Sequence, residues 1–223
     1  MSGDAELRPA PHSVGFNLLA IAVGVAVLSV GAAYLIDAAG KSAPTDGRSK
    51  ADKAVLSRTL GGHELQIPRA WFRYEEQAAE GFAKQIELRL ELPLGAKGKV
   101  EPVNVTLLPR SRARPSAALL DAVYLHQFQD GQMQGGPVGL VGKPLKGGEG
   151  YEGEVVWYDA LAADPFVAKC SKPVAEAAEG QCLRTVYLAA GIAAVYAFPE
   201  GALAGWRAFD AEMGKRLRGI GAL

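Results

Sequence analysis

The apolar stretch from Val14 to Ile36 constrains this chain more than any other feature, because only Asn17 and Ser29 interrupt it with polar side chains. As an α-helix rising about 1.5 Å per residue, it would be roughly 34 Å long, which exceeds the roughly 30 Å hydrocarbon core of a bilayer. A cleaved signal peptide has a shorter apolar core after a basic segment, whereas only Arg8 is basic here. The stretch therefore predicts an uncleaved, single-pass transmembrane helix, and the small residues at 37–40 leave processing open as the alternative.

The rest of the chain divides by composition. Residues 1–13 are a short N-terminal tail, and residues 37–55 are rich in Gly, Ser, Pro, Asp and Lys, which is typical of a flexible linker. Residues 56–223 have the apolar content of one folded domain. The 24 basic residues equal the 24 acidic ones, so no large basic surface for nucleic acid is expected.

Two signals disagree about the side of the membrane that carries the domain. Basic residues between 41 and 53 outnumber Arg8, which by the positive-inside rule places the domain in the cytoplasm. Cys170 and Cys182, the only cysteines, lie between predicted strands and indicate a disulfide in an oxidising compartment. Long domains cross the membrane largely regardless of flanking charge. We therefore expect a bacterial inner-membrane protein with its large domain in the periplasm. In the alternative, the domain is cytoplasmic and the two cysteines are unpaired, buried thiols.

Alternation of apolar and polar residues predicts most of the strands. It is clearest over residues 84–92, where every second side chain from Ile86 onward is Leu or Ile. The other predicted strands cover residues 56–60 and 64–67, joined as a hairpin by Gly61 and Gly62, and residues 103–107, 151–158, 166–170, 182–188 and 192–198.

Three- and four-residue apolar spacing predicts two helices. One begins at Pro115 and Ser116 and runs to about Phe128, and the other covers Leu203 to Ile220. The expected class is therefore α+β: an N-terminal transmembrane helix, then an extracytoplasmic antiparallel sheet of roughly six strands with two packed helices.

Two segments resemble the Mog1/PsbP-like group of small α+β domains. One is Leu65-Gln66-Ile67-Pro68-Arg69-Ala70-Trp71, and the other is the final hairpin followed by a helix with Trp206, Phe209, Met213 and Leu217. The resemblance covers residues 56–220 and implies an accessory or binding role, because such domains are known for stabilising or regulating partners. The anchor and the cysteine pair depart from that pattern, so the identity of a partner does not carry over.

Metal and nucleotide motifs are absent from the sequence. His12, His63 and His126 have no second ligand at metal-binding spacing. The glycine pairs at 135–136 and 147–148 are not followed by the Gly-Lys-Ser/Thr of a phosphate-binding loop. We therefore predict no metal site and no cofactor.

A hydrolytic site has little support. A hydrolytic triad would combine Ser116 or Ser171 with His126, but neither serine lies in a Gly-x-Ser-x-Gly elbow. Eleven residues separate the two cysteines, whereas a redox-active pair is usually two residues apart near a helix N-terminus, so a structural disulfide is expected. We predict a non-enzymatic protein without catalytic residues and keep a membrane-anchored hydrolase as the least favoured alternative.

Two features predict recognition. Arg110, Arg112 and Arg114 occupy alternate positions before a helix, where they can contact an acidic partner or anionic lipid headgroups, although solvated surface charges would have the same pattern. Ala20, Gly24 and Gly31 lie on one face of the predicted membrane helix and allow close packing of a second helix.

The leading hypothesis is therefore a membrane-anchored domain that binds or stabilises an envelope partner, as an accessory subunit of a membrane complex. The alternative is a small-ligand-binding domain, in which residues 131–150 cover a pocket lined by Trp71, Tyr151 or Trp157.

Overall fold

The computed structural model describes residues 54–148, 153–172, 179–189 and 191–223, all within the unit Lys50–Leu223. The predicted transmembrane helix, with Ala20, Gly24 and Gly31, lies outside the described residues. Across the part of the chain that is described, no helix is long and apolar enough to cross a membrane.

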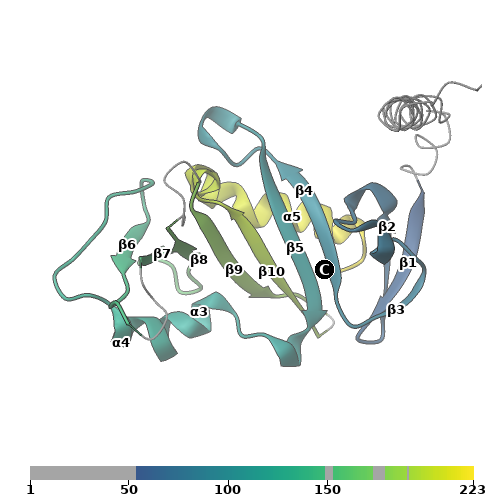
Figure 1. The fold of residues 1–223 in the computed structure, drawn as a ribbon, viewed down its shortest axis with the longest axis horizontal. Coiled ribbons are helices and arrows are strands. Elements are labelled where there is room, and N and C mark those ends of the chain that lie inside the picture. Colours follow the sequence, from purple (N-terminus) through teal and green to yellow (C-terminus); the bar gives the residue numbers. More distant parts are fainter. Residues whose placement is uncertain (1–53, 149–152, 173–178, 190) are drawn as a thin grey trace, which may run out of the picture. The chain divides into compact units, whose positions relative to one another are not determined.

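The described residues form two β-sheets and two helical segments (Figure 1). The strands are β1 (Val55–Leu60), β2 (His63–Pro68), β3 (Gly81–Ala83), β4 (Ile86–Leu92), β5 (Glu101–Pro109), β6 (Val141–Pro144), β7 (Glu154–Tyr158), β8 (Val167–Ser171), β9 (Gln181–Tyr187) and β10 (Ile192–Pro199). The helices are α3 (Ser116–Leu119), the π-helical turn η5 (Leu120–Tyr124), α4 (Leu125–Gln127) and α5 (Trp206–Gly219). Short 3₁₀ turns are η1 (Arg69–Trp71), η2 (Glu75–Gln77), η3 (Ala96–Gly98), η4 (Arg110–Arg112) and η6 (Glu200–Gly205).

The main sheet has seven strands in the order β4-β5-β10-β9-β8-β7-β6, and each neighbouring pair is antiparallel. The α+β class, the large antiparallel sheet and the two helices, α3–η5–α4 and α5, confirm the prediction at that level. The sheet has one strand more than the roughly six expected. The extra strand β6 is only four residues long and contains Gly142 and Pro144, so it carries no alternation that the sequence pattern could reveal.

The predicted hairpin forms, but in a second sheet. β1 and β2 pair antiparallel around Gly61 and Gly62, both of which have positive φ angles (59° and 88°) that favour glycine. The short strand β3 then adds parallel to β1, which gives the order β2-β1-β3. The backbone N–H of Gln66 donates to the carbonyl of Ile220 (3.1 Å), so this sheet is tied to the end of α5.

The larger core lies between the main sheet and α5. Phe209 of α5 is fully buried, and its ring contacts those of Phe166, Tyr196 and Phe198 at centroid distances of 5.8, 5.6 and 4.8 Å. Full burial of one such aromatic side chain contributes about 1.5–3 kcal/mol, and aromatic pairs add about 0.5–1.5 kcal/mol. The apolar spacing that predicted this helix therefore marks its buried face.

A smaller core lies on the opposite face of the sheet, at the β6–β8 end. Leu120 and Tyr124 of η5 pack there with Val156 of β7 and Val167 of β8. Their strand neighbours Val155, Trp157 and Ala168 belong to the larger core, because successive side chains of a strand point to opposite faces. Both faces of the sheet are thus covered at this end, and α3–η5–α4 is fixed beside β8 and β9.

Candidate functional site

The three predicted arginines lie in and just after η4, in the turn between β5 and α3 (Figure 1). The guanidinium carbon of Arg110 is 4.0 Å from the centre of the Tyr187 ring. The Tyr187 hydroxyl in turn donates a hydrogen bond to the carbonyl oxygen of Ala113 (2.9 Å). One tyrosine from β9 therefore holds the turn at both ends, through a cation–π contact and a hydrogen bond.

All three arginine side chains are exposed. Arg112 donates a long hydrogen bond to the carbonyl oxygen of Lys84 (3.4 Å), which links the turn to the start of β4. No carboxylate of the described residues forms an ion pair with Arg110, Arg112 or Arg114. The structure thus gathers three positive charges, without an ion-pair partner in the described part of the chain, at one end of the sheet, and we call this segment the arginine turn.

A cleft lies beside the arginine turn, where β8 and β9 separate. The two strands pair only over Lys169–Ser171 and Leu183–Gln181, so β9 continues past β8. At Thr185 the backbone N–H donates to the hydroxyl oxygen of Ser116 (2.9 Å) instead of to a strand. The resulting cavity, here called the β8–β9 cleft, has a volume of about 350 Å³. It is lined by Pro115, Ala117, Ala118, Asp164, Pro165, Arg184, Thr185, Val186 and Tyr187.

The inner wall of the cleft contains a buried arginine that is already paired. Arg184 donates to both carboxylate oxygens of Asp210 on α5 (3.1 and 2.8 Å) and to the carbonyl of Val167 (3.2 Å). Its guanidinium carbon also lies 4.5 Å from the centre of the Phe166 ring. Because these contacts satisfy and compensate its charge, Arg184 supports the wall of the cleft and adds little free positive charge to it.

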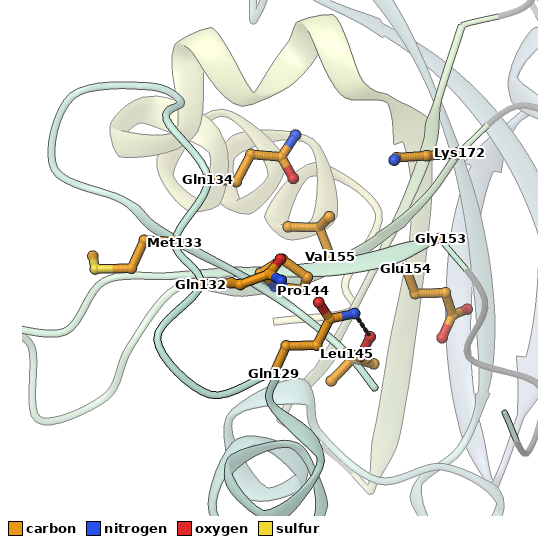
Figure 2. Close-up of a pocket in the computed structure, with 10 residues that line it drawn as sticks. All are labelled: Gln129, Gln132, Met133, Gln134, Pro144, Leu145, Gly153, Glu154, Val155 and Lys172. Atoms are coloured by element: carbon orange, nitrogen blue, oxygen red, sulfur yellow. Dashed lines mark hydrogen bonds between the residues drawn. The ribbon is translucent and has the colours of Figure 1, made fainter. Parts of the chain in front are cut away.

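A second cavity, of about 430 Å³, lies at the ends of β6 and β7 (Figure 2). It is lined by Gln129, Gln132, Met133, Gln134, Pro144, Leu145, Gly153, Glu154, Val155 and Lys172. We call it the glutamine pocket. Gln129 donates from Nε2 to the Leu145 carbonyl (2.8 Å), the dashed line of Figure 2, and Gln134 donates from its backbone to Gly142 (2.9 Å). Four glutamines lie between positions 127 and 134 of the sequence, but they form no motif that predicts a pocket.

One charged pair borders this pocket. Glu154 accepts a hydrogen bond from the Lys169 ammonium (2.6 Å) through Oε1, while its buried Oε2 has no partner among the described residues. Lys172 and Glu154 give the lining one charge of each sign, beside the amide groups of the glutamines. Such a lining can hydrogen-bond a small polar molecule.

The aromatic residues predicted to line a pocket lie elsewhere. Trp157 is buried in the larger core, where Gly136 and Gly142 pack directly against its ring, and a Cβ atom at either glycine would overlap that ring. Trp71 lies by a different, shallow cavity with Arg89 and Arg216, and Tyr151 lies outside the described residues. Trp157 therefore belongs to the core, and the lining that would favour the ligand-binding alternative does not include it.

Cys170 and Cys182 form a disulfide, as the sequence predicts. They are directly opposed residues of β8 and β9, with their Cα atoms 3.9 Å apart, and both are buried on the α5 side of the sheet. Their position next to the region where β8 and β9 separate makes them a covalent clamp on the closed end of these strands.

The serines and the histidine weighed for hydrolysis have other surroundings. Ser116 is buried and accepts a hydrogen bond from Thr185, and Ser171 donates a long one to the Gln181 carbonyl (3.4 Å). His126 is exposed on α4, and no hydrogen bond joins it to either serine in the described part of the chain. The described residues also contain no cluster of three or more potential metal ligands.

No protein-family model matches this chain, and no curated protein matches it significantly. Among solved structures, an immunity protein of the Stenotrophomonas maltophilia type IV secretion system has a similar fold, with a TM-score of 0.51 and 11% sequence identity. The match covers 74% of this chain and 92% of that protein. At this identity the likeness shows a shared fold alone, and the resemblance to Mog1/PsbP-like domains stays a prediction.

Proposed function

We propose that this chain is a non-enzymatic recognition protein whose large domain lies outside the cytoplasm and binds another protein of the cell envelope. The arginine turn is the observation that carries the proposal. Its three exposed cations have no carboxylate partner among the described residues, and Tyr187 contacts the turn through Arg110 and the Ala113 carbonyl. Arginine is enriched at protein interfaces, and a charge that is positioned in advance loses less conformational freedom on binding.

The disulfide and the membrane helix proposed for residues 14–36 determine the expected location. Disulfides persist in oxidising compartments, so Cys170–Cys182 supports a periplasmic domain. An anchor at residues 14–36 would keep that domain at the inner membrane and raise its local concentration near membrane-bound partners. An immunity protein of a secretion system shares the fold, which supports a binding role for such a scaffold without naming the partner of this chain.

Purification of the full-length chain from its native membranes in mild detergent, followed by native mass spectrometry, tests the proposal. We expect one defined envelope protein to co-purify in fixed stoichiometry. Recovery of the chain alone from cross-linked and uncross-linked membranes would contradict the proposal.

A second candidate function is the binding of a small polar ligand in the glutamine pocket. It is favoured by the cavity of about 430 Å³, within the range of about 300–1,000 Å³ that is usual for ligand sites, and by the three glutamines in its lining. The same native mass spectra test this alternative, because a bound small molecule adds a discrete mass. Replacement of Gln132 by Leu should then remove the adduct without unfolding the domain.

A further inference from the structure

We infer that the β8–β9 cleft is the anchor site for one apolar side chain of an acidic segment in the partner protein, with the arginine turn contacting the carboxylates around it. This inference rests on the proposed function and names the chemistry of the partner. It joins two observations that arise independently: a cavity whose mixed lining includes Pro, Ala and Val residues, and neighbouring arginines that have no carboxylate partner among the described residues.

The cleft exists because β8 and β9 pair over only part of their length. Past the pairing of Lys169 with Leu183, β9 has α3 beside it in place of a strand, and Ser116 accepts the backbone hydrogen bond of Thr185. A cavity of about 350 Å³ remains between the start of this helix and the part of β9 that does not pair with β8. Its walls are Pro115, Ala117 and Ala118 on one side, Pro165 on another, and Val186 on β9.

The arginine turn is joined directly to the cleft. Tyr187 lines the cleft and carries Arg110 on its ring, at 4.0 Å. Arg114 immediately precedes Pro115, the first residue of the opposite wall. A segment that places a side chain in the cleft therefore lies next to the part of the turn that carries Arg110 and Arg114.

The charges that face the cleft favour an acidic occupant. Two charged side chains line the cleft, and one of them, Arg184, is neutralised by Asp210. The other, Asp164, has no ion pair among the described residues, so it contributes the one negative charge of the lining. Against this single negative charge stand Arg110, which lies on the Tyr187 ring, and Arg114, which precedes Pro115, whereas Arg112 reaches the start of β4. Attraction between such groups speeds encounter and fixes orientation, while burial of an apolar anchor slows dissociation.

A protein segment fits this combination better than an anionic lipid headgroup. An anionic headgroup would contact the cations alone and would leave the neighbouring cavity, with its Pro, Ala and Val residues, unoccupied. An interface anchor needs both, because binding energy concentrates where an apolar side chain is removed from water next to arginine.

The test selects ligands from a random linear peptide library displayed on phage, with the full-length chain in mild detergent as the target. Enriched peptides should share carboxylates around one large apolar residue. Their affinity is then measured by fluorescence anisotropy for four proteins: the wild type, the arginine variant Arg110→Ala/Arg112→Ala/Arg114→Ala, and two single variants on the helical segment that follows the turn.

The single variants separate the cleft from its surroundings. Ala118→Leu places a larger side chain in the wall of the cleft and should lower the affinity at least tenfold. Ala122→Leu is the matched control, because Ala122 is also exposed on this segment but does not line the cleft, and it should leave the affinity within twofold of the wild type. Circular dichroism of both variants confirms that each is folded.

Each remaining outcome overturns a distinct claim. If the arginine variant loses the peptides while Ala118→Leu binds them normally, the cleft is not the anchor and the proposed function stands. If the enriched peptides bind the arginine variant as tightly as the wild type, the arginine turn does not bind them. The proposed function then loses the observation that carries it. If no acidic peptide is enriched and dihexanoyl-phosphatidylglycerol binds in an arginine-dependent manner, the turn recognises lipid and the inference fails.

Discussion

The guanidinium of Arg110 lies over the ring of Tyr187, with 4.0 Å between the guanidinium carbon and the ring centre. These residues are far apart in the sequence and belong to the turn after β5 and to the end of β9. The Tyr187 hydroxyl also holds the Ala113 carbonyl at 2.9 Å. A single side chain therefore contacts the arginine turn at two points and forms part of the cleft beside it.

Removal of the Tyr187 hydroxyl should loosen the turn without changing its charge. Tyr187→Phe keeps the aromatic face under Arg110 but leaves the Ala113 carbonyl without this donor. We expect a loss of about 0.5–1.5 kcal/mol in the free energy of unfolding, the usual net contribution of one hydrogen bond. Urea unfolding followed by circular dichroism measures it, and an unchanged midpoint would show that the hydrogen bond does not hold the turn.

Two neighbouring glycines should respond very differently to alanine. A Cβ atom at Gly136 would overlap the buried Trp157 ring, whereas one at Gly135 would meet nothing within 4 Å. Gly136→Ala should therefore lower the free energy of unfolding by about 1–3 kcal/mol through overpacking, and Gly135→Ala should stay within about 0.5 kcal/mol of the wild type. Tryptophan fluorescence during urea unfolding measures both, and equal effects would contradict this packing of Trp157.

Loss of the disulfide should destabilise the domain. Eleven residues separate Cys170 from Cys182, and the entropy of a loop of this length corresponds to about 3 kcal/mol. The free energy of unfolding of Cys170→Ala/Cys182→Ala should therefore be lower than that of the wild type by about 3 kcal/mol, and its urea midpoint should be lower as well. Dithiothreitol should lower the stability of the wild type and leave the double variant unchanged, so a wild type insensitive to the reductant would contradict the pairing.

The buried Tyr196 should make the domain sensitive to alkali. Burial raises the pKa of Tyr196 well above its usual range, the Asp210 carboxylate raises it further, and Arg184 opposes them. A raised folded-state pKa contributes stability that is fully present below the unfolded-state pKa of about 10 and is lost as pH rises from there through the folded-state pKa. At pH 11 the wild type should lose about 1.4 kcal/mol relative to its stability at pH 8, beyond any loss shared with a Phe variant.

Tyr196→Phe should remove this part of the alkaline loss, because phenylalanine does not ionise. Tyr74→Phe is the matched control, since Tyr74 is an exposed tyrosine whose replacement should keep the wild-type pH profile. Urea midpoints at pH 8 and pH 11 give the comparison. The same alkaline loss in Tyr196→Phe as in the wild type would assign it to other groups.

Local sequence patterns predicted the elements but not how they combine. Alternation over residues 86–92 and 103–107 specifies β4 and β5, and apolar spacing around Phe209 and Met213 specifies α5, because each pattern reflects burial on one face of one element. β3 lacks such a pattern, since its three residues pair with β1 across a long connection. Its place depends on contacts that no local pattern records.

The site shows the same limit. The arginines were predicted from their spacing, yet their contact with Tyr187 depends on the pairing of β9 with β10 and of β10 with β5. The β8–β9 cleft depends on where two strands stop pairing, and that register is set by side chains of the whole sheet. Trp157 and Trp71 were apolar residues whose place in core or pocket their sequence neighbours do not decide.

The central claim is that the arginine turn binds an envelope protein, and one comparison tests it most directly. Full-length wild type, the variant Arg110→Ala/Arg112→Ala/Arg114→Ala and the control Lys215→Ala/Arg216→Ala/Arg218→Ala are purified from native membranes in mild detergent. The control removes the same number of exposed positive charges from α5. Quantitative mass spectrometry then gives the amount of co-purifying partner per chain.

The account predicts that the arginine-turn variant retains at most a tenth of the partner, a loss of about 1.4 kcal/mol or more in binding, while the α5 control retains the wild-type amount. Equal partner recovery in all three proteins, with the arginine-turn variant folded by circular dichroism, would contradict it.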